Sequence, residues 1–198
     1  MTRHAAFGAL ALIGASGCAA TAGHSRAFDP NQLDPSEGWL VAAPVELVAQ
    51  AGSRDCGAAA LAMVAGHWGV PLSLGAAVQA LEATGTAAAG TGGSGTRLGD
   101  LRDLARTNGL KAFAIAGERS TLVHEVRAGR PVIVGLHLPG SLGKVRSHYE
   151  VVVGAHPADG RFVTLDPASG WRVRDWPSLD DAWRPAGRPA LVVVGTGR

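Results

Sequence analysis

Residues 55–61 read Asp-Cys-Gly-Ala-Ala-Ala-Leu and begin the strongest helix-forming run of the chain, which continues to His67. Asp55 can cap this helix, and Gly69 marks its end. Cys56 would then lie where unpaired backbone N–H groups and the positive end of the helix dipole favour a thiolate. Because a lone cysteine is about as often a small buried residue as a reactive group, its partners must decide between the two.

Outward from this helix, the chain changes from helical patterns to Val-rich strand patterns. Helices are predicted at about 74–83, 97–108 and 121–128, capped by Ser73, Thr96 and Ser120, and strands at 110–116, 131–138, 148–155, 161–165, 171–174 and 190–194. Residues 39–48 are predicted to be extended, and Trp171, Trp176 and Trp183 to be packing residues. Helices followed by hairpin-linked strands predict an α+β fold, with N-terminal helices packed on a C-terminal antiparallel sheet.

Three polar residues could cooperate with Cys56. His148 begins a strand, from which it can reach across a cleft, and Asp166 follows one hairpin later. Adjacent antiparallel strands could bring Asp166 beside His148 Nδ1 and fix the orientation of the ring. Asp-Pro-Ala-Ser-Gly is also a good turn, and both interpretations of Asp166 can hold together. Gln50, six positions before Cys56, could donate to an oxyanion, although it could equally be a solvated loop residue.

The other candidate groups have simpler interpretations. His137 is the one rival for the base, and it ranks behind His148 because no Asp-Pro turn follows it one hairpin later. Glu150 shares a strand face with His148, so it is either a second polar group in the cleft or, the favoured interpretation, a solvent-facing residue at a sheet edge. The glycines of residues 90–95 lack the phosphate-binding lysine of a P-loop, and the spacing of histidines and cysteines fits no metal site. No cofactor is therefore expected.

The order of these motifs resembles that of the bacteriocin-processing cysteine peptidases, which cut leader peptides after a Gly-Gly pair. The resemblance runs from about Val45 to Gly170 and is carried by Gln50, Asp55-Cys56-Gly57-Ala58-Ala59-Ala60-Leu61, Gly95-Thr96-Arg97-Leu98, Pro131-Val132-Ile133-Val134, His148-Tyr149-Glu150-Val151-Val152 and Asp166-Pro167. That family is best known as a domain of membrane-bound peptide exporters. This sequence shows neither transporter helices nor a nucleotide-binding loop, so we expect a free-standing relative.

The resemblance implies a papain-like fold and a thiol peptidase. It implies Cys56 as nucleophile, His148 as general base, Asp166 as orienting carboxylate and Gln50 as oxyanion donor. The substrate would be an exported peptide or protein, cleaved after small residues such as Gly-Gly. Two alternatives stay open: an acyl or amide transferase of transglutaminase-like type, and a non-catalytic domain that binds a leader peptide.

The N-terminus predicts export. Arg3 and His4 precede an apolar run of signal-peptide length, which ends in Ala15-Ser16-Gly17-Cys18 and resembles a bacterial lipobox. Residues 1–17 are thus predicted to be a lipoprotein signal peptide, 18–38 a polar tether and 39–198 the peptidase domain. Ordinary signal cleavage near Ala19 or Ala20, with Cys18 incidental, is the alternative. A lipid on Cys18 would anchor the protein in the bacterial cell envelope facing the periplasm, at the outer membrane rather than the inner.

Length and composition fit this picture. The 198 residues suffice for one domain, and with 46% hydrophobic and 17% charged residues they can bury a core. A formal net charge of +2 gives no basic surface for nucleic acid, and no internal repeat or heptad predicts an assembly, so a monomer is expected. If Cys18 carries lipid or is removed, Cys56 is the one remaining thiol of the mature chain.

Overall fold

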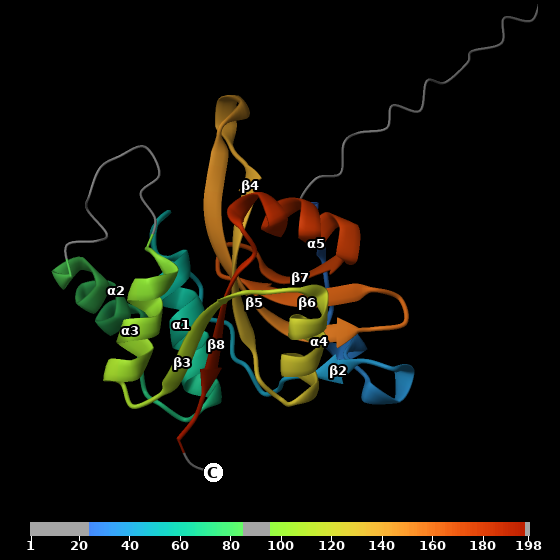
Figure 1. Ribbon diagram of the computed structural model, residues 1–198, viewed down its shortest axis with the longest axis horizontal. Coiled ribbons are helices and arrows are strands. Elements are labelled where there is room, and N and C mark those ends of the chain that lie inside the picture. Colours follow the sequence, from blue (N-terminus) through green and yellow to red (C-terminus); the bar gives the residue numbers. More distant parts are fainter. Residues whose placement is uncertain (1–23, 85–95, 197–198) are drawn as a thin grey trace, which may run out of the picture.

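In a computed structural model of the chain, described for residues 24–84 and 96–196, one antiparallel sheet lies between two groups of helices (Figure 1). The helices are α1 (Cys56–His67), α2 (Leu74–Ala83), α3 (Leu98–Thr107), α4 (Arg119–Arg127) and α5 (Trp176–Trp183). The strands are β1 (Arg26–Ala27), β2 (Leu40–Val41), β3 (Lys111–Ala116), β4 (Val132–Pro139), β5 (Val145–His156), β6 (Arg161–Asp166), β7 (Gly170–Asp175) and β8 (Pro189–Val194). Short 3₁₀ turns span Pro30–Gln32, Pro35–Glu37, Ser141–Gly143 and Arg184–Ala186.

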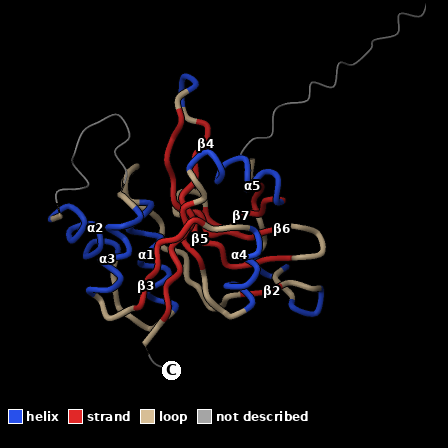
Figure 2. The backbone as a smooth tube through the Cα atoms, in the orientation of Figure 1, coloured by secondary structure: helices blue, strands red, loops and turns tan. Residues whose placement is uncertain are grey.

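The sheet has the strand order β1-β7-β6-β5-β4-β8-β3, and β2 pairs with the far end of β5. All of its pairings are antiparallel. The strand tubes cross the middle of the molecule and the helices lie outside them (Figure 2). The strand that carries His148 is therefore central, flanked by β4 on one side and β6 on the other.

Both faces of the central strands are buried, which explains why their sequences are nearly continuous runs of valine rather than alternating patterns. Along β5, Val151 and Val153 belong to the core that α1, α2 and α3 cover, whereas Val152 belongs to the core beneath α4 and α5. Figure 1 shows α1, α2 and α3 grouped on one side, and α4 and α5 on the other. The α+β fold with helices on an antiparallel sheet is confirmed, with a second helical layer added.

Most predicted elements are present within two or three residues of their expected bounds. The helix α5 was not among the predicted elements, and it carries Pro177 near its start. Pro is nevertheless tolerated in a first helical turn, and Asp175 caps this helix by accepting a hydrogen bond from the backbone N–H of Ser178, 2.9 Å away. The predicted Thr96 cap of α3 is wrong: Arg97 is the capping position, and its N–H donates to the Asp100 carboxylate.

The folded part of the chain begins before Trp39, the predicted domain boundary. Within the predicted tether, residues 24–38 contain β1 and two 3₁₀ turns, and Phe28 and Leu33 pack against the core of the α1 side. The Arg172 side chain donates to both the hydroxyl and the carbonyl oxygen of Ser25. The predicted signal peptide, residues 1–17, and Cys18 lie outside the described residues.

Across residues 24–84 and 96–196, no helix has both the length and the apolar character needed to span a membrane.

Candidate active site

Cys56 is the first residue of α1 and is buried, with 6% of its surface exposed. The turn before it is closed by the Asp55 carboxylate, which accepts from the Gly52 N–H at 2.6 Å instead of capping the helix itself. The Asp55 carboxylate therefore does not cap the first-turn N–H groups of α1. The backbone N–H groups of Gly57 and Tyr149 both hydrogen-bond to the Cys56 sulfur.

His148 lies on β5 and is buried, with 2% of its surface exposed. Its Nε2 and the Asp166 Oδ1 are 2.6 Å apart, and its ring also hydrogen-bonds to the Cys56 thiol. The expectation that Asp166 would meet Nδ1 was wrong. Because Nε2 is taken by Asp166, Nδ1 is the nitrogen left for the thiol, and the guanidinium of Arg146 also lies 3.5 Å from it.

Asp166 ends β6, and both of its carboxylate oxygens are held in place. Oδ1 accepts from the backbone N–H of Ala168 at 2.8 Å as well as from His148, and Oδ2 accepts from the Ser169 hydroxyl at 2.5 Å. The Asp-Pro-Ala-Ser-Gly segment is thus a turn that also positions the Asp166 carboxylate, so both interpretations of Asp166 hold. The orientation of the imidazole is thereby fixed from a rigid hairpin.

Electrostatics favour the charged forms of all three side chains. Burial by itself would raise the pKa of the Cys56 thiol, but the hydrogen bond and charge of His148 outweigh it and lower that pKa. Burial opposes the charge of His148 too, yet Asp166 and Cys56 raise its pKa to about 9. Burial likewise opposes the charge of Asp166, and the hydrogen bonds from His148 and Ser169 hold its pKa well below the usual range. The arrangement favours a thiolate beside an imidazolium near neutral pH.

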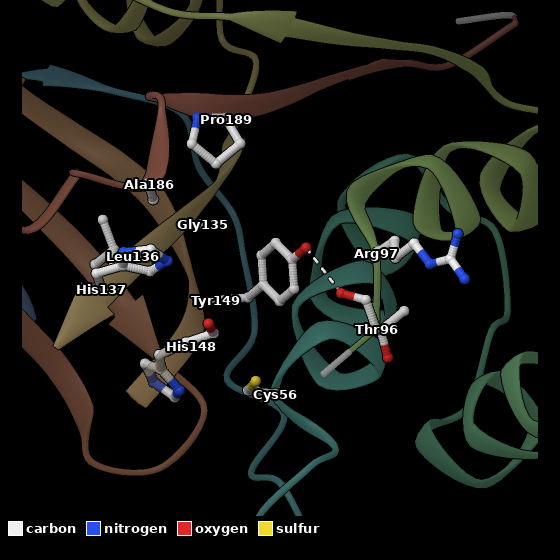
Figure 3. Close-up of a pocket in the computed structure, with 11 residues that line it drawn as sticks. Cys56, Thr96, Arg97, Gly135, Leu136, His137, His148, Tyr149, Ala186 and Pro189 are labelled. Carbon is white, nitrogen blue, oxygen red and sulfur yellow. Dashed lines mark hydrogen bonds between the residues drawn. The ribbon is translucent and has the colours of Figure 1, made fainter. Parts of the chain in front are cut away.

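The thiol opens into a cleft of about 170 Å³ between the sheet and the helical layer. Figure 3 shows Leu136, His137 and His148 on the sheet side and Thr96 and Arg97 on the helical side. The ring of Tyr149 lies between the two sides, and its hydroxyl donates to the carbonyl oxygen of Thr96 at 2.9 Å (Figure 3).

The wall of this cleft is packed tightly at a glycine. A Cβ at Gly135, which lines the cleft, would meet Pro189 at 3.0 Å and the Tyr149 ring at 3.1 Å. Behind the cleft, a Cβ at Gly57 would meet the Tyr149 ring at 3.2 Å and the Thr96 side chain at 3.3 Å. The cavity is smaller than the roughly 300–1,000 Å³ of ordinary ligand pockets.

Gln50 lies in the turn that precedes α1. Its backbone N–H donates to the carbonyl of Pro167, which ties the segment before Cys56 to the turn that carries Asp166. Its side-chain amide nitrogen donates to the carbonyl of Gly52 at 2.9 Å, and its Oε1 is buried without a hydrogen-bond partner. The Gln50 side-chain nitrogen is thus engaged within its own turn, and the oxyanion role stays a prediction.

Glu150 does not face solvent, and the favoured prediction for it was wrong. It is fully buried, and its two carboxylate oxygens accept from the two terminal nitrogens of Arg174 on β7. The hydroxyl of Thr164 on β6 also donates to it, at 2.7 Å. A buried carboxylate is tolerated here because a buried guanidinium neutralises it through two parallel hydrogen bonds. That partner is 24 positions away, and no sequence pattern indicates it.

One group of side chains in the described part of the chain brings enough ligand atoms together to be considered for a metal. An imidazole nitrogen of His148 and carboxylate oxygens of Glu150 and Asp166 all lie within 4.8 Å of one another. However, His148 Nε2 is bonded to Asp166, and both oxygens of Glu150 are bonded to Arg174. These groups satisfy one another, so they do not form a metal-ligand set.

The sequence identified Cys56, His148 and Asp166, which the structure brings together. It did not indicate that Tyr149, Thr96 or Arg174 would lie at or next to the site. Tyr149 directly follows His148, and strand alternation does put it on the opposite face, towards α1. That signal could have placed it against Gly57. His137, the rival base, lines the same cleft from β4.

Solved structures share this architecture. The peptidase domain of the Streptococcus transporter ComA matches with a TM-score of 0.60 and 23% identity, covering 77% of this chain and 100% of that domain. A double glycine motif protease from an AMS/PCAT transporter, in complex with the leader peptide, matches at 0.59 and 21%, over 78% of this chain and 94% of its own. A C39-like peptidase from Bacillus anthracis matches at 0.61 and 17%, over 81% and 99%. A comparison with curated proteins gave no significant match.

The fold is the papain-like fold of these peptidase domains. The family model described as "Peptidase C39 family" matches residues 44–186, which is most of the chain. The chain therefore belongs to the Peptidase C39 family.

Proposed function

We propose that this protein is a thiol peptidase that cleaves an exported peptide or protein substrate with Cys56, His148 and Asp166. The observation that carries the proposal is the buried contact of the Cys56 thiol, the His148 imidazole and the Asp166 carboxylate at the wall of a narrow cleft. Family membership supports the same class of reaction. A non-catalytic binding domain would have no need to stabilise a thiolate.

In the proposed reaction, the Cys56 thiolate attacks the scissile carbonyl carbon and forms a tetrahedral intermediate. The backbone N–H of Cys56 donates to the oxyanion, together with the Gln50 side-chain amide once it has turned away from Gly52. The His148 imidazolium then gives its proton to the leaving amine, which departs and leaves a thioester on Cys56. His148, now neutral, takes a proton from water, which attacks the thioester and releases the acid product.

For the substrate, we propose an extended segment with small residues at the cleavage site, such as Gly-Gly. The small volume of the cleft and its close wall at Gly135 support this choice. The neighbour that is a double glycine motif protease was solved in complex with the leader peptide, which supports a peptide substrate for this fold. We propose further that the protein acts as a monomer, anchored in the envelope by a lipid on Cys18 and facing the periplasm.

The decisive experiment uses a peptidyl inhibitor that ends in Gly-Gly and carries a thiol-reactive group. The protein from residue 24 onward should be labelled stoichiometrically, and the modified tryptic peptide should contain Cys56. Cys56→Ala should not be labelled, and His148→Ala should be labelled at least a hundredfold more slowly. Equal labelling of Cys56→Ala would contradict the proposal. Mass spectrometry of a cleaved Gly-Gly peptide with and without an amine acceptor separates hydrolysis from acyl transfer.

A further inference from the structure

A buried ion pair lies directly behind the His148–Asp166 contact, and the proposed reaction makes no use of it. Glu150 on β5 and Arg174 on β7 have exposed fractions of 0% and 3%. Thr164 on β6 joins them: its hydroxyl donates to Glu150 at 2.7 Å and lies 3.3 Å from an Arg174 nitrogen. The group therefore links three neighbouring strands, two of which carry His148 and Asp166.

The location of this pair matters because Glu150 is a second carboxylate at one imidazole. Its oxygen, a ring nitrogen of His148 and an oxygen of Asp166 lie within 4.8 Å of one another. In a buried site, charges at that separation interact strongly. Left uncompensated, Glu150 would compete with Asp166 for the ring and add to the negative charge around it. Arg174 prevents this by binding both oxygens of Glu150.

We propose that Glu150 and Arg174 are positioning residues. As a neutral ion pair behind the ring, they keep His148 paired with Asp166 rather than with Glu150, and they determine how strongly the imidazolium retains its proton. This inference rests on the proposed function of the Cys56–His148 pair.

Other charges also face His148 and stay constant in the test. They are the Cys56 thiolate from α1, Arg146 on β5, which is exposed, and Asp166 from β6. The imidazole of His137 on β4 lines the same cleft. Of the charged groups around the imidazole, Glu150 and Arg174 alone neutralise each other through a two-point contact, so removing one of them changes the net charge behind the ring.

The test compares the alkaline limb of the pH profile of kcat/KM in Glu150→Gln and in the wild type. Gln has the shape of Glu without its charge, so the Arg174 cation would be left facing the imidazolium. The limb, expected near pH 9 in the wild type, should move down by about one pH unit. The double variant Glu150→Gln/Arg174→Met, which is again neutral, should return the limb to within about 0.3 unit of the wild type.

Thr164→Val is the matched control. It removes a buried hydrogen bond from the same network without changing charge, so it should lower the melting temperature and leave the limb in place. If Glu150→Gln does not fold, Arg174→Gln measures the same coupling with the opposite sign, and its limb should rise. Titration of the His148 ring by NMR in a Cys56→Ala background repeats the comparison without activity.

An unchanged limb in Glu150→Gln, or a double variant whose limb stays displaced, overturns this inference and assigns the pair to folding alone. That outcome is distinct from failure of the proposed function. In the latter case the wild type itself would show no Cys56 labelling and no cleavage.

Discussion

The protonation states of Cys56 and His148 determine the pH range in which this site can attack an acyl carbon. The thiol has a lowered pKa and the imidazole has a pKa raised to about 9, so the thiolate–imidazolium pair exists between these two values. Below the lower one, the thiol holds its proton and cannot attack. Above about 9, His148 has lost the proton that the leaving amine needs.

We therefore expect a bell-shaped pH profile of kcat/KM, with its acid limb well below the ordinary cysteine pKa of about 8.5 and its alkaline limb near 9. The rate of Cys56 alkylation by iodoacetamide should rise along the same acid limb, because alkylation needs only the thiolate. An alkylation rate that rises only around pH 8.5 would show that His148 does not lower the pKa of the thiol.

Asp166→Asn tests the orienting carboxylate. Asn keeps the size of the side chain but removes the charge that raises the pKa of His148, so kcat/KM should fall roughly 10²–10⁴-fold and the alkaline limb should move down. Asp159→Asn, at a half-exposed carboxylate that pairs with Arg161, is the control and should keep full activity. Equal activity of Asp166→Asn and the wild type would contradict the role.

The same carboxylate makes stability depend on pH in the acid range. The folded-state pKa of Asp166 lies below its unfolded value of about 3.9, so its contribution is present above that value and is lost as the pH falls below it. Urea unfolding at pH 6 and at pH 3 should therefore show that the free energy of unfolding falls more between these pH values in the wild type than in Asp166→Asn. Parallel losses in the two proteins would contradict this assignment.

At the scale of elements, Tyr149 joins β5 to the segment that leads into α3, across the cleft. It is the one tyrosine of the chain, so its phenol absorbs without interference from another. Burial, with the Cys56 charge, raises the pKa of this phenol well above its usual value of 10. Absorbance at 295 nm should accordingly show no phenolate at pH 10 in the folded protein, and about half of the phenolate signal at that pH in guanidinium, as expected of a free tyrosine.

Tyr149→Phe removes only the hydroxyl that donates to Thr96. We expect a loss of about 1 kcal/mol in the free energy of unfolding, and a larger effect on KM than on kcat because the cleft wall loosens while Cys56 and His148 keep their contact. Chemical denaturation and steady-state kinetics measure the two effects. A fall in kcat at unchanged KM would instead give the hydroxyl a part in the chemistry.

The helix α5 is the clearest test of how the second helical layer is held. Trp183 is fully buried in the core beneath α4 and α5, and its indole N–H donates to the carbonyl of Pro189 at 3.0 Å. Trp183→Ala should lower the free energy of unfolding by about 3–5 kcal/mol, and Trp183→Phe by less. Leu142→Ala, at a residue 94% exposed, is the control and should leave stability unchanged.

Some parts of the structure can be predicted from the sequence and others cannot. The helix that begins at Cys56 and the strand that begins near His148 follow from local signals: helix formers behind a turn, and valine runs bounded by turns. That Cys56 and His148 meet in the fold is predicted by the order of the motifs along the chain. The partner of Glu150 does not follow, because a contact between side chains on non-adjacent strands leaves no trace in spacing. Nor does the choice of Nε2 over Nδ1, which depends on how the ring turns about its side-chain bonds.

At the scale of the whole molecule, the site depends on two cores packed against one sheet. Cys56 is carried by the layer of α1, α2 and α3, whereas His148 and Asp166 come from the central strands β5 and β6. The cleft therefore lies at a boundary between layers, and its geometry depends on how α1 packs on β5. Leu61, fully buried on α1, is in this contact layer. Damage to that layer would separate the thiol from the imidazole even if both residues were intact.

The remaining whole-molecule question is where the peptidase is held, and the two cysteines of the chain can answer it. We propose that Cys18 carries a lipid in the mature protein, so that Cys56, which is free in the folded domain, is the one thiol left to titrate. Protein purified from membranes should then show one thiol per chain under denaturing conditions, and an intact mass that includes the lipid. In Cys18→Ser the protein should leave the membrane fraction and retain its full kcat/KM, because the anchor is not part of the cleft. Two free thiols would contradict the anchor and favour a signal peptide that is not cleaved. A single thiol in a protein that never enters the membrane fraction would also contradict it and favour ordinary signal cleavage beyond Cys18.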